Sequence, residues 1–132
     1  MRRVPPAFYN RPVMYSTELL DHFQNPRNAG DLAEPDALAQ VENPACGDVL
    51  RLTLKVSDNR ITGAAFKAKG CVPTIACGSA LTSLIIGKTL HEARRLSRTD
   101  VSVAVGSVPQ ASTHAAQLAI DALVAALDQI GR

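Results

Sequence analysis

The sequence feature that most constrains the fold is a hairpin pattern between Cys46 and Cys71. In residues 49–57, leucine or valine alternates with arginine, threonine or lysine, and in residues 64–69 alanine or phenylalanine alternates with alanine or lysine. Alternation with a period of two is typical of strands that are buried on one face. Asp58-Asn59-Arg60 lies between the two segments, so the pattern predicts two antiparallel strands joined by a three-residue turn.

The positions of the apolar residues predict how these two strands pair. Both apolar sets are even-numbered, so a shared buried face requires even positions to lie opposite even positions. A turn at residues 58–60 satisfies this condition and places Leu52 opposite Phe66. It also places Gly47 opposite Cys71 at the open end of the hairpin.

This register brings Cys46, Asp48 and Cys71 together at one place. Two packed apolar thiols and a carboxylate at the start of a strand are the simplest interpretation. The glycines next to both cysteines and the convergence of three donor groups favour a metal site instead, because thiolates and carboxylates are common zinc ligands.

Composition limits the classes of function. The 132 residues fit one domain, and with 46% hydrophobic but only 4% aromatic residues its core must be built mainly from aliphatic side chains. A net charge of +2, without a basic stripe or aromatic platform, predicts no nucleic-acid partner. No apolar run approaches the ~20 residues of a membrane span, so no membrane partner is expected. Three cysteines without the spacing of a disulfide framework predict a cytoplasmic location.

The beginning of the chain differs from the rest. Residues 1–13 contain three prolines, three arginines and no acidic residue, and they lack the apolar core of a signal peptide. We therefore expect a flexible tail over residues 1–14 and a single domain over residues 15–132.

Helical patterns surround the hairpin. One helix is expected after the N-cap Ser16 and ends before Pro26, and another follows Cys71 with Pro73 in its first turn. The remaining predicted elements are a short edge strand at 38–42, short helices at 89–96 and 99–105, and a long helix at 112–130. These elements predict an α+β fold, with a small antiparallel β-sheet of about three strands covered on one face by helices and a long C-terminal helix.

Cys77 is expected in the core rather than at the site. It shares one helical stripe with Leu81, Leu84 and Ile85, and cysteine is among the residue types most often buried. Cys71 instead precedes a helix N-terminus, where the helix dipole favours a thiolate.

Four motifs occur in order along the chain. They are Asp21-His22-Phe23-Gln24-Asn25-Pro26-Arg27-Asn28-Ala29-Gly30, Pro44-Ala45-Cys46-Gly47-Asp48, Phe66-Lys67-Ala68-Lys69-Gly70-Cys71 and Gly87-Lys88-Thr89-Leu90. Together they resemble the NifU/IscU-type iron–sulfur cluster assembly scaffold family, and the resemblance spans Tyr15 to the C-terminus. It implies an IscU/SufE-like fold and a protein that is not an enzyme. Such a protein holds a transient [2Fe–2S] cluster, made with sulfur from a cysteine desulfurase, and passes it to apo iron–sulfur proteins.

The third ligand motif of the family is altered in this chain. The family has His-Cys at the start of the long C-terminal helix, where the cysteine is a ligand and the main sulfur acceptor, whereas the matching pair here is His114-Ala115. The proline-rich segment before it is reduced to Val108-Pro109-Gln110. These changes bear on the assembly cycle and leave the expected fold unaltered. Cys71 is then the best remaining sulfur acceptor.

The resemblance adds His114 to the predicted ligands. An exposed histidine in a first helical turn is the simpler interpretation, but the matched motif favours a ligand. Cys46, Asp48, Cys71 and His114 would supply two sulfur atoms, one oxygen and one nitrogen. Zinc accepts such ligands at about 2.0–2.3 Å, and [2Fe–2S] clusters with two histidine and two cysteine ligands exist.

Several functions remain compatible with these ligands. The leading interpretation is a scaffold or carrier that binds a [2Fe–2S] cluster or iron, with zinc as a possible occupant of the purified protein. The alternatives are a zinc-binding regulatory or structural member of the fold, or a sulfur-transfer protein that uses the Cys71 thiol. The expected partners are a cysteine desulfurase and apo iron–sulfur proteins, and the chain is expected to be a monomer or a weak homo-oligomer.

Overall fold

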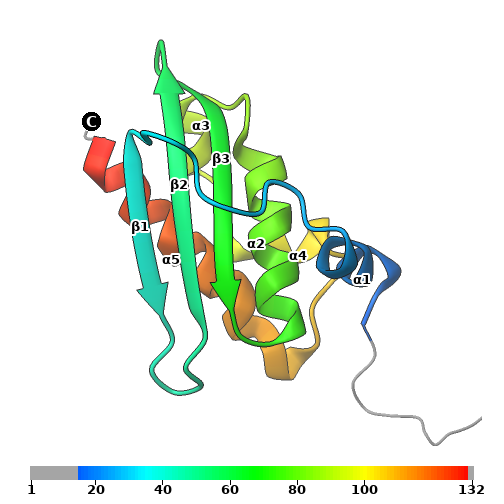
Figure 1. Cartoon of the computed structure of the whole chain (residues 1–132). Helices are drawn as coiled ribbons and strands as arrows, with labels where there is room; N and C mark the ends of the chain where they lie inside the picture. The colour runs from blue at the N-terminus through cyan, green and yellow to red at the C-terminus, as the bar shows by residue number, and fades with distance from the viewer. Residues whose placement is uncertain (1–14, 131–132) are drawn as a thin grey trace, which may run out of the picture.

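The computed structural model describes residues 15–130 (Figure 1). The elements in chain order are α1 (Thr17–Gln24), β1 (Ala37–Glu42), β2 (Val49–Ser57), β3 (Arg60–Lys69), α2 (Val72–Ile85), α3 (Leu90–Arg94), α4 (Arg98–Ala104), a 3₁₀ turn (Gln110–Ser112) and α5 (Thr113–Ile130). The tail expected at residues 1–14 lies outside the described residues. Within residues 15–130, no helix is long and apolar enough to cross a membrane.

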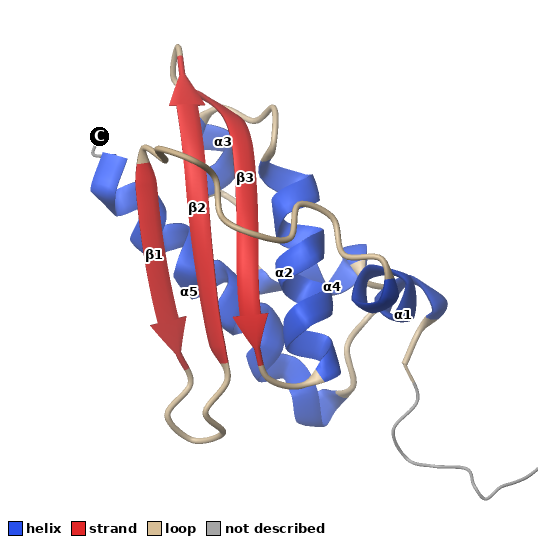
Figure 2. Cartoon of the chain, viewed as in Figure 1, coloured by secondary structure: helices blue, strands red, loops and turns tan. Residues whose placement is uncertain are grey.

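The three strands form one antiparallel sheet in the order β1-β2-β3. Figure 2 shows α2 and α5 behind this sheet, while the connection from α1 to β1 crosses its opposite face. Helix α5 contacts β1 and β2, and α2 contacts β3, so the two helices cover the apolar face side by side. The predicted α+β fold, including the long C-terminal helix, is confirmed.

The register of the hairpin is the predicted one over most of its length. Leu52 lies opposite Phe66, and Val49 lies opposite Lys69 at the open end. The side chains of Leu50, Leu52 and Phe66 are buried, as the shared apolar face requires.

The turn of the hairpin differs from the prediction. Ser57 pairs directly with Arg60, so Asp58 and Asn59 alone form the turn, with φ angles of 52° and 63°. Two consecutive residues with positive φ match the twist of a hairpin, and aspartate and asparagine tolerate this conformation. A bulge between Lys55 and Val56 shifts the pairing by one residue, which restores the even register at the open end.

Both edges of the sheet are covered by polar groups of the same chain. At the β3 edge, Phe66 N–H donates to Asn28 O at 2.9 Å and Gly30 N–H donates to Phe66 O at 2.8 Å. At the β1 edge, the Gln129 side chain accepts from Leu38 N–H at 3.0 Å and donates to Leu38 O at 2.6 Å. These bonds satisfy edge groups that would otherwise pair with another chain.

Helix α2 is buried on more sides than one apolar stripe predicts. Besides the expected Cys77, Leu81 and Ile85, its buried residues include Thr74, Ser79 and Thr82. The helix contacts the sheet on one side and α1 and α5 on others, so small and polar residues are buried along with the large apolar ones.

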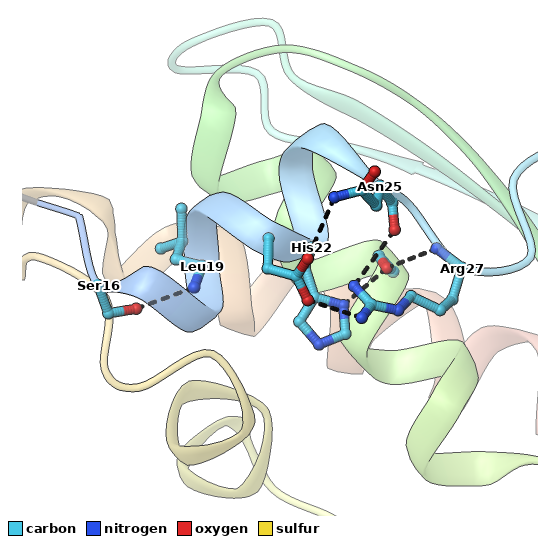
Figure 3. A network of polar contacts seen from close by, with 7 residues as sticks. Ser16, Leu19, His22, Asn25 and Arg27 are labelled. Atoms are coloured by element: carbon cyan, nitrogen blue, oxygen red, sulfur yellow. Dashed lines mark hydrogen bonds and ion pairs between the residues drawn. The ribbon is translucent and has the colours of Figure 1, made fainter.

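Helix α1 is attached to the rest of the molecule by polar contacts (Figure 3). The predicted N-cap is confirmed, since Leu19 N–H donates to Ser16 Oγ at 2.9 Å. At the other end, His22 Nδ1 lies 2.7 Å from the buried Ser79 Oγ, which also accepts from Arg27 N–H at 2.8 Å. These contacts give His22 a role in docking α1 on α2.

Candidate metal centre

The candidate site lies at the open end of the hairpin, where three segments far apart in the sequence meet. The loop between β1 and β2 carries Cys46 and Asp48, the junction of β3 and α2 carries Cys71, and the first turn of α5 carries His114. Figure 1 shows these three segments together at the lower end of the sheet. Cys46 is exposed, Cys71 and His114 are half-buried, and Asp48 is 5% exposed.

The Asp48 carboxylate is the centre of the group. Its Oδ2 atom lies 3.4 Å from Cys71 Sγ and 3.4 Å from His114 Nε2. Cys71 Sγ and His114 Nε2 are 4.0 Å apart. Ligand atoms of Cys46, Asp48 and His114 all lie within 4.8 Å of one another, as the donors of one metal site would. The structure thus brings Cys46 and Cys71 each close to Asp48 and His114, although the group within 4.8 Å does not include Cys71, and metal binding by the four residues stays a prediction.

The backbone around Asn43 shapes the loop that carries Cys46 and Asp48. Asn43 O accepts from Gly47 N–H at 2.7 Å, and its side-chain oxygen accepts from Ala45 N–H at 3.0 Å. Gly47 has a φ of 79°, a conformation that glycine adopts at little cost. Asn43 N–H also donates to Asp48 O at 2.8 Å, which closes the loop. This local folding sets Cys46 and Asp48 side by side.

Asp48 is held on two sides by residues of the β3–α2 junction. Thr74 Oγ1 donates to Asp48 Oδ2 at 2.6 Å. On the other side, a Cβ atom at Gly70 would collide with Asp48 Oδ1, so only glycine leaves room for the carboxylate there. Burial by itself would raise the pKa of Asp48, but hydrogen bonds from Thr74, Cys71 and His114 outweigh it and lower the pKa below its usual value.

Thr74 was not among the site residues predicted from the sequence. One signal was available, because the third residue after an N-cap lies on the same face as the cap. Cys71 is the N-cap of α2, so the hydroxyl of Thr74, three residues later, lies on the same side of the helix as the Cys71 thiol.

Cys77 lies in the core, as predicted. Its side chain is fully buried, and burial first and then the neighbouring Cys71 charge raise its pKa to about 12. A thiol in this environment is mainly protonated at neutral pH, which disfavours metal binding.

Residue 115 also contributes no donor atom to the site. Ala115 follows His114 in the first turn of α5 and is 1% exposed. Its methyl group packs in the core beside the donor group.

Comparisons with known proteins agree on one family. The family profile described as "NifU-like N terminal domain" matches residues 14–131. The chain is 44% identical over 110 residues to "Iron-sulfur cluster assembly scaffold protein IscU 1" of Archaeoglobus fulgidus, covering 83% of this chain and 72% of that protein. It is 39% identical over 119 residues to "Iron-sulfur cluster assembly enzyme IscU" of Drosophila melanogaster, covering 87% of this chain and 77% of the relative.

A solved structure shows the same architecture. The crystal structure of a nitrogen-fixing NifU-like protein (N-terminal) from Brucella abortus superimposes with a TM-score of 0.71 at 26% sequence identity. The superposition covers 87% of this chain and 92% of that one.

Proposed function

The chain belongs to the family of the NifU-like N-terminal domain, and from this premise we propose that it is an iron–sulfur cluster assembly scaffold or carrier. The cargo is a [2Fe–2S] cluster, bound transiently by Cys46, Asp48, Cys71 and His114. The observation that carries this proposal is the position of the Asp48 carboxylate, within 3.4 Å of both Cys71 Sγ and His114 Nε2 and within 4.8 Å of a Cys46 donor.

The mixed donor set suits a carrier better than a permanent cluster site. Thiolates are the preferred ligands of cluster iron, and replacing two of them by a carboxylate and an imidazole weakens the hold on the cluster. The exposed Cys46 gives a recipient direct access to one ligand. Zinc accepts the same four donors, so it is a competing occupant when the isolated protein is prepared without iron.

Sulfur delivery fits the exposure of the cysteines. We propose a cysteine desulfurase as the donor, whose persulfide is attacked at its outer sulfur by a cysteine thiolate of this chain. The sulfur–sulfur bond of the donor breaks, and the desulfurase thiolate leaves. The sequence favoured Cys71 as the acceptor. Its sulfur is half-buried against Asp48 and Thr74, so the exposed Cys46 is the better first acceptor.

The remaining roles follow from transfer of cargo. Apo iron–sulfur proteins are the recipients, the cytoplasm is the proposed location, and the chain acts as a monomer or a weak homo-oligomer. We propose a scaffold rather than an enzyme because the side chains of the site are those of a ligand set. The names of the two relatives differ in this respect. The Archaeoglobus fulgidus protein is called a scaffold protein, and the Drosophila melanogaster protein is called an assembly enzyme.

Anaerobic reconstitution with iron and sulfide tests the proposed function. The unaltered chain should develop the visible absorption of a [2Fe–2S] cluster, with equal amounts of bound iron and sulfide, and lose it to an apo-ferredoxin. Cys46→Ala and Cys71→Ala should not retain the cluster. Cys77→Ala is the matched control and should retain it, because Cys77 is buried away from the site. Failure of the unaltered chain to bind a cluster would contradict the proposal.

A further inference from the structure

Thr74 is a buried polar residue whose side chain makes an unusual bond for a helix. A threonine hydroxyl in a helix commonly donates to a backbone carbonyl of the preceding turn. Thr82, in the same helix, does this by donating to Ser79 O at 2.8 Å. Thr74 is 1% exposed, and its hydroxyl donates instead to a carboxylate from another segment, Asp48 Oδ2, at 2.6 Å.

This bond is the shortest contact of Asp48 Oδ2 with the side chains around it. The same oxygen lies 3.4 Å from Cys71 Sγ and 3.4 Å from His114 Nε2. Gly70 leaves room for the other carboxylate oxygen, since any side chain there would collide with it. The bond from Thr74 holds the carboxylate so that Oδ2 faces both a sulfur and a nitrogen donor.

Thr74 also contacts a second proposed ligand, the Cys71 thiol. Its Oγ1 atom is 3.2 Å from Cys71 Sγ, at the N-terminus of the same helix. A hydroxyl has a single proton, and the 2.6 Å distance assigns that proton to Asp48. The Thr74 proton therefore holds Asp48, and Cys71 Sγ, 3.4 Å from the same carboxylate oxygen, lies beside it.

We propose that Thr74 is a positioning residue of the metal centre, which acts by holding the Asp48 carboxylate in its ligating orientation. The proposal rests on the proposed role of Asp48 as a ligand. Partners that orient ligands in this way commonly change metal affinity by about 10–100-fold when they are removed.

The test uses Co²⁺ alone as the probe, titrated anaerobically into the full chain. Thr74→Val keeps the branched shape and removes the hydroxyl. We expect Co²⁺ to bind about 10–100-fold more weakly, with altered visible absorption because the geometry of the oxygen ligand changes. Thr74→Ser restores the hydroxyl and should recover both the affinity and the spectrum. Thr82→Val is the matched control, and it should leave the affinity of the site unchanged.

A double-mutant cycle separates positioning from general support of the fold. In an Asp48→Ala background the carboxylate is absent, so Thr74→Val should then change Co²⁺ affinity little. If Thr74→Val does not fold, Thr74→Ala takes its place in the same cycle. Equal losses in both backgrounds would overturn the proposal, and so would unchanged affinity in Thr74→Val or Thr74→Ala.

The outcomes also distinguish this proposal from the proposed function. A chain that binds Co²⁺ in a Thr74-dependent way but never retains a cluster would keep the positioning role and contradict the scaffold function. A chain that retains a cluster whatever residue stands at position 74, with unchanged Co²⁺ affinity, would support the scaffold function and contradict the positioning role of Thr74. Lack of Co²⁺ binding by the unaltered chain would overturn the positioning role together with the metal site.

Discussion

At the scale of single residues, the three cysteines have three environments, and these determine the chemistry of each thiol. Cys46 is exposed on a loop, Cys71 is half-buried beside a carboxylate, and Cys77 is fully buried. The thiolate is the reactive form, so both exposure and pKa decide reactivity.

The different exposure of the three cysteines predicts the order in which they are alkylated in the folded protein. Iodoacetamide should modify Cys46 first and Cys71 more slowly, whereas Cys77, with a pKa of about 12, should react only after unfolding. Mass spectrometry of peptides after timed labelling measures the order, and the same chain in denaturant is the control. Modification of Cys77 in the folded state would show that α2 opens at this point.

At the scale of elements, the docking of α1 on α2 uses a contact of the half-buried His22. Arg27 N–H donates to Ser79 Oγ, which also lies 2.7 Å from His22 Nδ1, within hydrogen-bond distance. Burial first, and then the charge of Arg27, lower the pKa of His22 below its usual 6.5, while Asp21 opposes this shift.

Stability should therefore fall in acid through His22. Its pKa is lower in the folded state than in the unfolded state, so the unfolded chain binds more protons as pH falls through 6.5. The contribution of His22 is fully present above that pH and declines below it. Urea unfolding at about pH 8 and about pH 5.5 should show a smaller loss for His22→Gln than for the unaltered chain.

The exposed His91 supplies the control for this experiment. His91→Gln should keep the pH dependence of the unaltered chain. An identical pH dependence in His22→Gln would mean that another group accounts for the loss.

At the scale of the whole molecule, α2 and the sheet approach each other closely at Gly78. A Cβ atom there would lie 2.6 Å from the ring of Phe66 and 3.0 Å from Leu50. Both residues belong to the buried face of the sheet, so this contact sets the distance between α2 and the sheet, and with it the position of Cys71 at the helix N-terminus.

We expect Gly78→Ala to destabilise the fold by about 1–3 kcal/mol, because the added methyl group overpacks a filled core. Denaturant unfolding measures the free energy, and Ser83→Ala, at an exposed position of the same helix, is the control. The cost should shrink in a Phe66→Leu background, where the ring is absent. A stabilised Gly78→Ala variant would show that helix propensity outweighs the contact.

Much of the fold could be predicted from the sequence because its signals act over short distances along the chain. Alternation in the hairpin determined the pairing of Leu52 with Phe66, and the cap at Ser16 marked where the first helix begins. The same register brought Cys46, Asp48 and Cys71 together without knowledge of any other element. His114 is far from them in sequence, and only the resemblance to a family pointed to it.

Only the tertiary structure decided how these groups are held. The Thr74–Asp48 bond joins α2 to the β1–β2 loop, and the His22–Ser79 bond joins α1 to α2. Neither pair shares a periodic pattern, because each bond depends on how two elements pack rather than on the conformational preference of either one. Hydrophobic periodicity determines which face of an element is buried. The polar partner of a buried side chain is determined by how the helices and the sheet pack together in the tertiary structure.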